Sequence, residues 1–142
     1  MATAIFISVK PEFAEKIFNG NKTIELRKCQ PKAKKGDLVI VYSTDPIKAV
    51  IGVCQVSEII KLSPKKMWQL HKNSLGIDKK RFDEYYDDYE TAIGIKITSI
   101  SALGRQISLS AIRRILPGFQ PPQTFKYYKK PHLFKSYLRL AS

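Results

Sequence analysis

The segment Gly20-Asn21-Lys22-Thr23-Ile24-Glu25-Leu26-Arg27 decides how this chain is interpreted. It places a glycine, a lysine, a carboxylate and an arginine at the spacing G-x-K-x-x-E-x-R, between a predicted helix and a predicted strand. Side chains alternate between the two faces of an extended strand. Thr23, Glu25 and Arg27 therefore share one face, and Ile24 and Leu26 share the other. We expect the apolar pair to anchor the strand to a core and the polar row to face a groove or solvent.

The polar row has two interpretations. An acid and a base held side by side on a rigid strand can read a polar ligand through its pattern of donors and acceptors. The alternative is a solvated strand face carrying an ion pair, which contributes little to stability. The spacing alone does not decide between these two interpretations.

The spacing G-x-K-x-x-E-x-R resembles the signature of the ASCH domain family, a branch of the PUA-like fold. Further stretches resemble ASCH features in the same order: Ile7-Ser8-Val9-Lys10-Pro11, the helix after it, Lys35-Gly36-Asp37 before a strand, and Pro121-Pro122-Gln123-Thr124-Phe125. The resemblance covers most of the chain. It implies a small β-barrel with flanking helices and a cleft suited to RNA or a nucleotide.

Hydrophobic patterning predicts the order of the elements. Strands are expected at 4–9, 23–27, 38–43, 49–60 (bent at Gly52) and 91–100, with a short one at 107–109. Helices are expected after Lys10, after Ser63, after Asp78 and after Ser110, the last one stopping at Pro117. The second of these helices should bury Met67, Trp68, Leu70 and His71. Short strands with interspersed helices suit an α+β fold with a partly closed β-barrel, and no linker divides residues 1–142 into more than a single domain.

The charge distribution favours a polyanionic partner. The chain holds 25 Lys plus Arg against 12 Asp plus Glu, a formal net charge of +13. No carboxylate follows Glu90, whereas the segment 83–90 is an acidic block. Neutralised phosphates release counterions, so a basic surface of this kind favours nucleic acid. Simple solubility is the alternative explanation.

Several classes of protein are disfavoured by the residue pattern. Two cysteines cannot form a disulfide framework or a zinc site by themselves. Neither a nucleophile elbow nor a phosphate-binding Walker loop occurs, and metal-ligand spacing is absent, so we expect no metal and no cofactor. The start of the chain lacks signal-peptide features, and no apolar stretch approaches the roughly 20 residues of a membrane span. We expect a cytoplasmic protein without membrane contact and leave its oligomeric state open.

The candidate binding residues follow from how single-stranded RNA is recognised, by stacking on aromatic rings and by polar contacts to base edges. Tyr42, Phe125, Tyr127 and Tyr128 are possible platforms, with core packing as the alternative. Arg27 and Glu25 can meet a base edge, Lys22 and Lys10 can meet a phosphate, and Gln123 offers a donor and an acceptor. The set for RNA, other nucleic acid or a nucleotide-like small molecule is Lys10, Lys22, Glu25, Arg27, Tyr42, Ser43, Gln123, Phe125, Lys126 and Tyr127.

The resemblance also implies two hydrolytic activities. Some small ASCH relatives hydrolyse an acylated cytidine with a lysine, a threonine two residues beyond a K-T pair, and a later glutamate. Lys22 and Thr23 match the K-T pair, but Glu25 stands at the nucleophile position, so we expect no efficient hydrolysis of N4-acetylcytidine. Another ASCH protein is a ribonuclease.

The candidate catalytic residues are therefore Lys22, Thr23 and Glu25. A module that binds RNA and acts in RNA metabolism, or in regulating transcription or translation, is preferred over a hydrolase or ribonuclease. A protein-interaction module is the third class.

Overall fold

A six-stranded mixed sheet forms the centre of the molecule, with strand order β2-β5-β4-β3-β1-β6. The computed structural model describes residues 4–123 and 125–128. The strands are β1 (Ala4–Val9), β2 (Ile24–Arg27), β3 (Leu38–Ser43), β4 (Ala49–Leu62), β5 (Ala92–Ser108) and β6 (Phe125–Tyr128). The helices are α1 (Pro11–Phe18), α2 (Pro64–His71), the 3-10 helix η1 (Lys72–Ser74), α3 (Lys79–Tyr85) and α4 (Leu109–Ile115). The sheet curves into a half-barrel with flanking helices, which confirms the α+β expectation.

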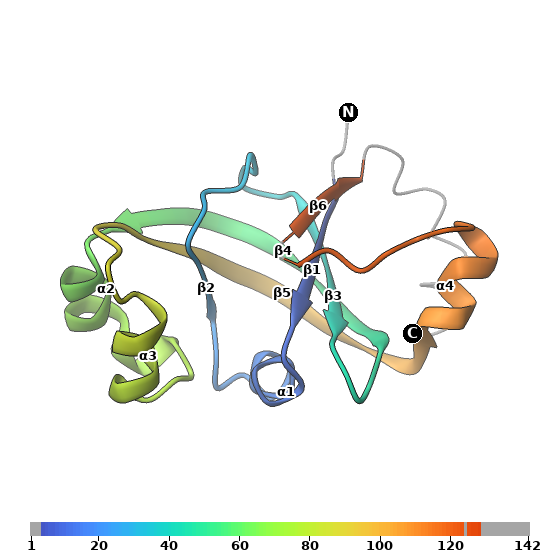
Figure 1. Ribbon diagram of the computed structural model, residues 1–142, viewed down its shortest axis with the longest axis horizontal. Coiled ribbons are helices and arrows are strands. Elements are labelled where there is room, and N and C mark those ends of the chain that lie inside the picture. Colours follow the sequence, from blue (N-terminus) through green and yellow to red (C-terminus); the bar gives the residue numbers. More distant parts are fainter. Residues whose placement is uncertain (1–3, 124, 129–142) are drawn as a thin grey trace.

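Two long antiparallel strands, β4 and β5, extend along the length of the molecule (Figure 1). Their pairing shifts register at three places: Val50/Gly52, Val53/Gln55 and Val56/Glu58. Such β-bulges bend a strand and increase its twist, so the pair can curve. The bend expected at Gly52 coincides with one of these shifts. A side chain there would also collide with the ring of Phe18, so the glycine lets α1 pack closely on the sheet.

Alternation along the strands divides the apolar side chains between the two faces of the sheet. On one face, Ile5 and Ile7 pack with Ile17 of α1. On the other face, Phe6 packs with Ile112 of α4. A third cluster joins β2 to α2 and α3 and contains Ile24, Leu26, Met67, Phe82 and Tyr86. The strand β2 is therefore anchored on its apolar side by the helices at one end of the molecule.

Several predicted boundaries were wrong. The expected strand at 107–109 is not separate, because β5 stays paired with β4 as far as Ala49 and Ser108. The helix after it is capped by Ser108, whose hydroxyl accepts from the N–H of Ala111 at 3.2 Å, and not by Ser110. Leu70 is 65% exposed, since the short α2 touches the core mainly through Met67.

Some predictions fall outside the described residues. They concern Thr124, the basic and aromatic segment 129–142, and the side chain of Tyr128. Within the part of the chain that the structure describes, no helix has the length and apolar character needed to cross a membrane.

Candidate functional site

A pocket of about 550 Å³ lies where the ends of β1 and β2 meet α1, with residues of α3 and the 122–123 turn completing its wall. This volume is within the range of small-molecule binding pockets. Its lining combines backbone and side chains from segments far apart in the sequence. Lys22, Glu25 and Arg27 of the G-x-K-x-x-E-x-R segment line it together.

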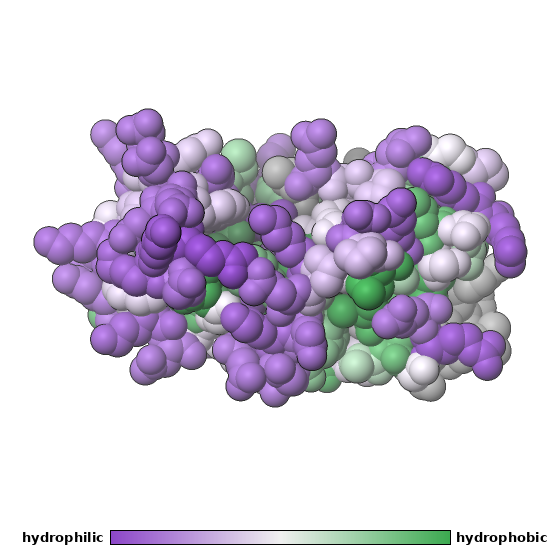
Figure 2. Space-filling model, turned by 60° about the horizontal axis from the view of Figure 1, so that its bottom comes forward, coloured by the Kyte–Doolittle hydropathy of each residue, from purple (hydrophilic) through white to green (hydrophobic). Residues whose placement is uncertain are grey.

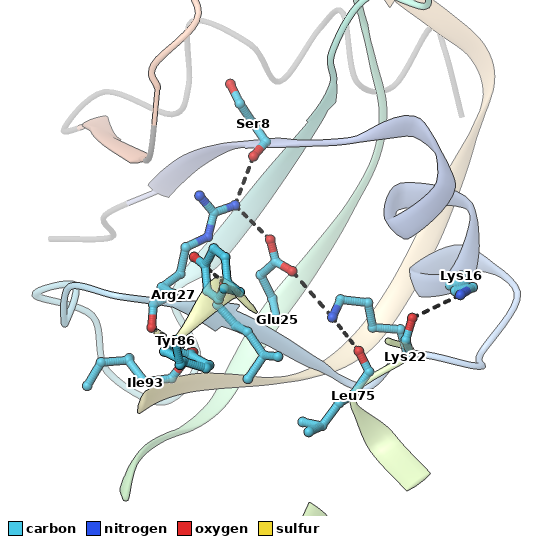
Figure 3. A network of polar contacts seen from close by, with 11 residues as sticks. Ser8, Lys16, Lys22, Glu25, Arg27, Leu75, Tyr86 and Ile93 are labelled. Carbon is cyan, nitrogen blue, oxygen red and sulfur yellow. Dashed lines mark hydrogen bonds and ion pairs between the residues drawn. The ribbon is translucent and has the colours of Figure 1, made fainter. Parts of the chain in front are cut away.

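Glu25 holds the centre of the polar row (Figure 3). Its Oε2 accepts a hydrogen bond from Arg27 Nη2 at 2.7 Å, and its Oε1 lies 3.6 Å from Lys22 Nζ. Arg27 Nη2 also donates to the backbone oxygen of Ser8 at 2.9 Å, and Lys22 Nζ donates to the backbone oxygen of Leu75 at 2.6 Å. Arg27 thus ties β2 to β1, Lys22 ties it to the segment after η1, and the carboxylate of Glu25 pairs with both cations.

The three charged side chains are buried. Lys22, Glu25 and Arg27 are 3%, 6% and 7% exposed, which excludes the solvated strand face as an interpretation. Burial lowers the pKa of Lys22 by disfavouring its charged form, and the nearby Glu25 opposes this shift. The charges are held in place by mutual pairing and by backbone acceptors, as buried charges require.

Local structure explains why the row faces the pocket. β2 pairs only with β5 in the sheet order, with Glu25 opposite Ile95 and Arg27 opposite Ile93. Its apolar side chains point to the α2 and α3 cluster, so the alternate side chains turn towards α1 and β1. Tyr86 supports this arrangement from below, since its hydroxyl donates to the backbone oxygen of Arg27 at 2.9 Å.

Two aromatic residues of the pocket were missed by the sequence analysis. Phe13 of α1 and Tyr85 of α3 both line it. The ammonium of Lys22 lies 5.3 Å from the Phe13 ring centroid, and that of Lys28 lies 4.6 Å from the Tyr85 centroid. In the sequence, Phe13 lies in the helix expected after Lys10, and no motif singles it out as a binding residue. Tyr85 sits inside the acidic block, where nothing in the sequence pattern points to a ligand.

Of the other candidates near this segment, some line the pocket and one does not. Lys10 and Gln123 are exposed and line it. Thr23, which directly precedes β2, is exposed and not part of the lining, although its backbone oxygen still accepts from the N–H of Ile97 of β5 at 3.0 Å. Thr23 therefore does not join Glu25 at the pocket.

Tyr42 does not reach the pocket. It is 3% exposed and packs 6.0 Å, centroid to centroid, from Phe6 in the cluster beneath α4. The alternation of β3 places Tyr42 with Ile40, on the face opposite Val39 and Val41. The interpretation of Tyr42 as a stacking platform is therefore wrong, and the alternative of core packing holds.

The candidates on β6 lie outside the pocket lining as well. Phe125 and Tyr127 pack against the α1 side of the sheet, and the Tyr127 hydroxyl accepts from the N–H of Lys32. Lys126 is exposed and lies 5.8 Å from the ring centroid of Phe119, which belongs to the opposite face. The rings of Phe125 and Tyr127 therefore serve packing, which was the alternative left open for them.

Ser43 lines a different hollow, of about 450 Å³, on the other side of α1. Its walls include Phe18, Ile51 and Leu103, and the half-exposed Ile47 lies at its edge. On the face shown in Figure 2, apolar side chains gather on the half of the molecule that holds the turn between β3 and β4, and polar side chains dominate the other half. Ser43 is 1% exposed and is not brought to Glu25 and Arg27.

Metal binding has no support within residues 4–123 and 125–128, where no group of three or more His, Cys, Asp or Glu side chains could hold an ion. The pocket combines one buried carboxylate and two buried cations with two exposed lysines, Lys10 and Lys28, and two aromatic rings. These groups can donate to and accept from a polar planar ligand while aromatic rings cover its faces.

The comparisons with known proteins agree on one family. The model of the ASCH domain matches residues 7–101. An ASCH domain-containing ribonuclease of Zymomonas mobilis is 28% identical over 124 residues, which is 87% of this chain and 83% of that protein.

Solved structures give the same result. The crystal structure of ASCH from Zymomonas mobilis has a TM-score of 0.91 at 27% identity, covering 98% of this chain and 96% of that one. Human THYN1, solved in complex with DNA that contains 5-methylcytosine, has a TM-score of 0.60 at 10% identity, covering 99% and 98% of the two chains. That second likeness is one of fold alone. Since the family match spans the greater part of the sequence, including the G-x-K-x-x-E-x-R segment, the chain belongs to the ASCH domain family.

Proposed function

We propose that this protein binds single-stranded RNA and places one unpaired nucleotide in the pocket between β1, β2, α1 and α3. The observation that carries this proposal is the buried row of Lys22, Glu25 and Arg27 in a pocket of about 550 Å³ that is also lined by Phe13 and Tyr85. A row that served only the fold would not need an open pocket beside it. The net charge of +13 and the ribonuclease relative support RNA as the ligand.

The parts of the pocket have separate tasks in this proposal. A carboxylate has about four acceptor positions, so Glu25 keeps acceptor capacity beyond its contacts with Lys22 and Arg27. The base edge meets Glu25 and Arg27, and the face of the base stacks on Tyr85. Lys10 and Lys28, both exposed at the pocket, meet the phosphates. Gln123 can donate or accept at the mouth.

The pair Tyr85 and Tyr89 offers a matched test. Lys28 Nζ lies 4.6 and 4.8 Å from their two ring centroids, but Tyr89 does not line the pocket. Base stacking on an aromatic ring contributes about 1–3 kcal/mol. Tyr85→Leu should therefore weaken binding of a labelled single-stranded RNA by about 5-fold to 150-fold, measured by fluorescence anisotropy. Tyr89→Leu should leave the affinity nearly unchanged.

Weaker binding in Tyr89→Leu, with full affinity in Tyr85→Leu, would refute the pocket as the binding site. If both variants bind RNA with the affinity of the unchanged protein, the base does not stack on Tyr85. Circular dichroism of the Tyr85 variant checks that its fold is retained, because Tyr85 is half-buried and its hydroxyl contacts the backbone oxygen of Leu26 at 3.4 Å.

RNA cleavage is the second candidate function, favoured by the ribonuclease relative that matches 87% of this chain. Lys22 and Glu25 both line the pocket, and Lys22 Nζ lies 3.6 Å from Glu25 Oε1, so an acid and a base stand side by side there. Burial lowers the pKa of Lys22, which brings its proton exchange closer to neutral pH. Thr23 is no part of this candidate, since it lies outside the pocket lining.

End-labelled RNA, incubated with the protein and analysed by electrophoresis, tests cleavage. Shorter fragments that are lost in Lys22→Met, and retained in Lys72→Gln purified in the same way, support a ribonuclease. Intact RNA under conditions where anisotropy shows binding supports a binding module. The expected lack of activity on N4-acetylcytidine stays a prediction, motivated by Glu25 at the nucleophile position.

A further inference from the structure

We propose that the loop of residues 28–37, which joins β2 to β3, is a subsite for the phosphodiester backbone of single-stranded nucleic acid. We call it the lysine loop, after Lys28, Lys32, Lys34 and Lys35. The inference rests on the proposed function: the pocket holds one nucleotide, and the lysine loop binds the phosphates of its neighbours. What it adds to the proposed function is the path that the nucleic-acid strand takes as it leaves the pocket.

The lysine loop begins at the pocket and forms a second hollow of its own. Lys28 lines the pocket directly after Arg27. The following residues, from Gln30 to Lys34 together with Asp37, line a separate hollow of about 540 Å³. Figure 1 shows this blue loop rising from the end of β2 and returning to β3. A nucleic-acid strand that leaves the pocket past Lys28 therefore meets a second hollow, whose lining begins two residues later at Gln30.

The hollow offers positive charge that is not neutralised. Lys32, Lys34 and Lys35 are exposed and take part in none of the ion pairs among the described residues. The carboxylate of the loop, Asp37, is 8% exposed, and its Oδ2 accepts the backbone N–H of Lys34 at 2.9 Å. Two cations at the α3 end of the molecule are instead already paired, Arg81 with Glu12 and Lys79 with Asp83.

The backbone of the lysine loop is fixed, although its lysine side chains are exposed. The N–H of Gly36 donates to the backbone oxygen of Val56 at 2.8 Å, and the N–H of Val56 donates to the backbone oxygen of Asp37 at 2.9 Å. These two hydrogen bonds attach the end of the loop to β4. On the opposite side, the N–H of Lys32 donates to the Tyr127 hydroxyl of β6. Lysines on a fixed backbone lose less freedom on binding than lysines on a mobile tail, which favours a specific path for a polyanion.

A double variant tests the subsite. Lys32→Gln with Lys34→Gln removes two positive charges from exposed positions and leaves the pocket lining intact. Each phosphate contact on a single strand contributes about 0.7 to the slope of log K against log salt. The slope for single-stranded RNA should therefore become shallower by about 1.4, and the affinity at low salt should fall equally for different base sequences.

The matched control is Lys65→Gln with Lys66→Gln, the same change of charge on exposed residues of α2 that line neither the pocket nor the hollow of the lysine loop. It should leave the slope unchanged. Binding of nucleoside monophosphates, which need only the pocket, should be the same in both double variants and in the unchanged protein.

The outcomes separate this inference from the proposed function. Equal slopes for the loop variant and the unchanged protein overturn the subsite alone, and so do equal losses in the loop variant and the α2 control, which would mean a general charge effect. Loss of monophosphate binding in the loop variant places the lysines in the pocket itself and also overturns the subsite. If the unchanged protein binds no RNA at low salt, both the subsite and the proposed function are wrong.

Discussion

Glu25 is the residue on which the polar row depends, because it is the carboxylate between two buried cations. Lys22 and Arg27 each also contact a backbone oxygen, but Glu25 supplies the negative charge that both of them face. Removing one partner of a buried ion pair leaves the other charge uncompensated, which costs far more than loss of a surface pair.

Glu25→Gln should therefore lower the free energy of unfolding by about 3–5 kcal/mol. Guanidinium denaturation followed by circular dichroism measures it. Glu58→Gln is the matched control, since Glu58 is exposed on β4, and it should stay within about 0.5 kcal/mol of the unchanged protein. A loss below about 1 kcal/mol for Glu25→Gln would mean that solvent, and not Glu25, compensates the two cations.

Cys54 is a second residue whose environment sets its chemistry. It is 1% exposed in the cluster under α1, and burial raises the pKa of its thiol from 9.0 to about 12. A pKa raised in the folded state means that the folded protein holds the proton more tightly than the unfolded chain. This contribution to stability is complete below the unfolded value and is lost as the pH rises towards the folded value.

The stability of the unchanged protein relative to Cys54→Ala should therefore fall with pH above about 9. The expected decrease is about 1 kcal/mol between about pH 9 and about pH 10. Lys22, whose pKa is lowered, acts in the opposite direction but is common to both proteins. Denaturation curves under reducing conditions at each pH give the difference, and a difference independent of pH would show that the thiol titrates normally in the folded state.

At the scale of the elements, the segment from Ser74 to Gly76, between η1 and α3, is hydrogen-bonded to α1 and to the residues just before β2. Its three backbone oxygens accept from the N–H of Thr23 at 3.0 Å, from Lys22 Nζ at 2.6 Å and from Lys16 Nζ at 2.9 Å. Gly76 has a positive φ of 63°, and an added Cβ would lie 2.8 Å from the Cβ of Lys22. The glycine is needed both for its backbone conformation and for its closeness to Lys22.

Gly76→Ala should destabilise the protein more than Gly118→Ala. Both positions have positive φ, which costs alanine about 1–2 kcal/mol, but nothing lies within 4 Å of a Cβ at Gly118. The crowding against Lys22 should add about 1–3 kcal/mol at Gly76. Thermal and chemical denaturation of the two variants measure the difference, and equal losses would indicate that the contact with Lys22 relaxes without cost.

At the scale of the whole molecule, the formal net charge of +13 dominates interactions with polyanions. The charge is unevenly spread over the described surface. Carboxylates gather on and after α3, whereas the lysine loop has Asp37 as its one carboxylate, and that side chain is buried. Long-range attraction of RNA should therefore depend on salt and be stronger over the lysine loop than over the exposed carboxylates of the acidic block.

RNA binding should show a slope of log K against log salt near −3 to −4, if about 4–6 phosphates are neutralised on a single strand. Anisotropy titrations at several salt concentrations measure this slope. A flat response, or no binding to single-stranded RNA at low salt, would contradict the assignment of the basic surface to nucleic acid.

The sequence by itself determined the features that depend on local backbone geometry. Alternation along a strand places Glu25 and Arg27 on one face and Ile24 and Leu26 on the other, whatever surrounds them. The order of strands and helices, the bend at Gly52 and the family signature are likewise local in the sequence. The expectation for Thr23 failed, because its side chain is exposed and does not line the pocket.

Only the tertiary structure decided which side chains meet that row and whether it is buried. Tyr85 reaches the pocket from α3, 58 residues beyond Arg27 in the numbering, and Phe13 reaches it from α1. Tyr42 is excluded because the sheet directs it to the opposite face, into the core beneath α4. Spacing along the chain cannot give such contacts, since packing of helices on a curved sheet brings together residues that no local pattern links.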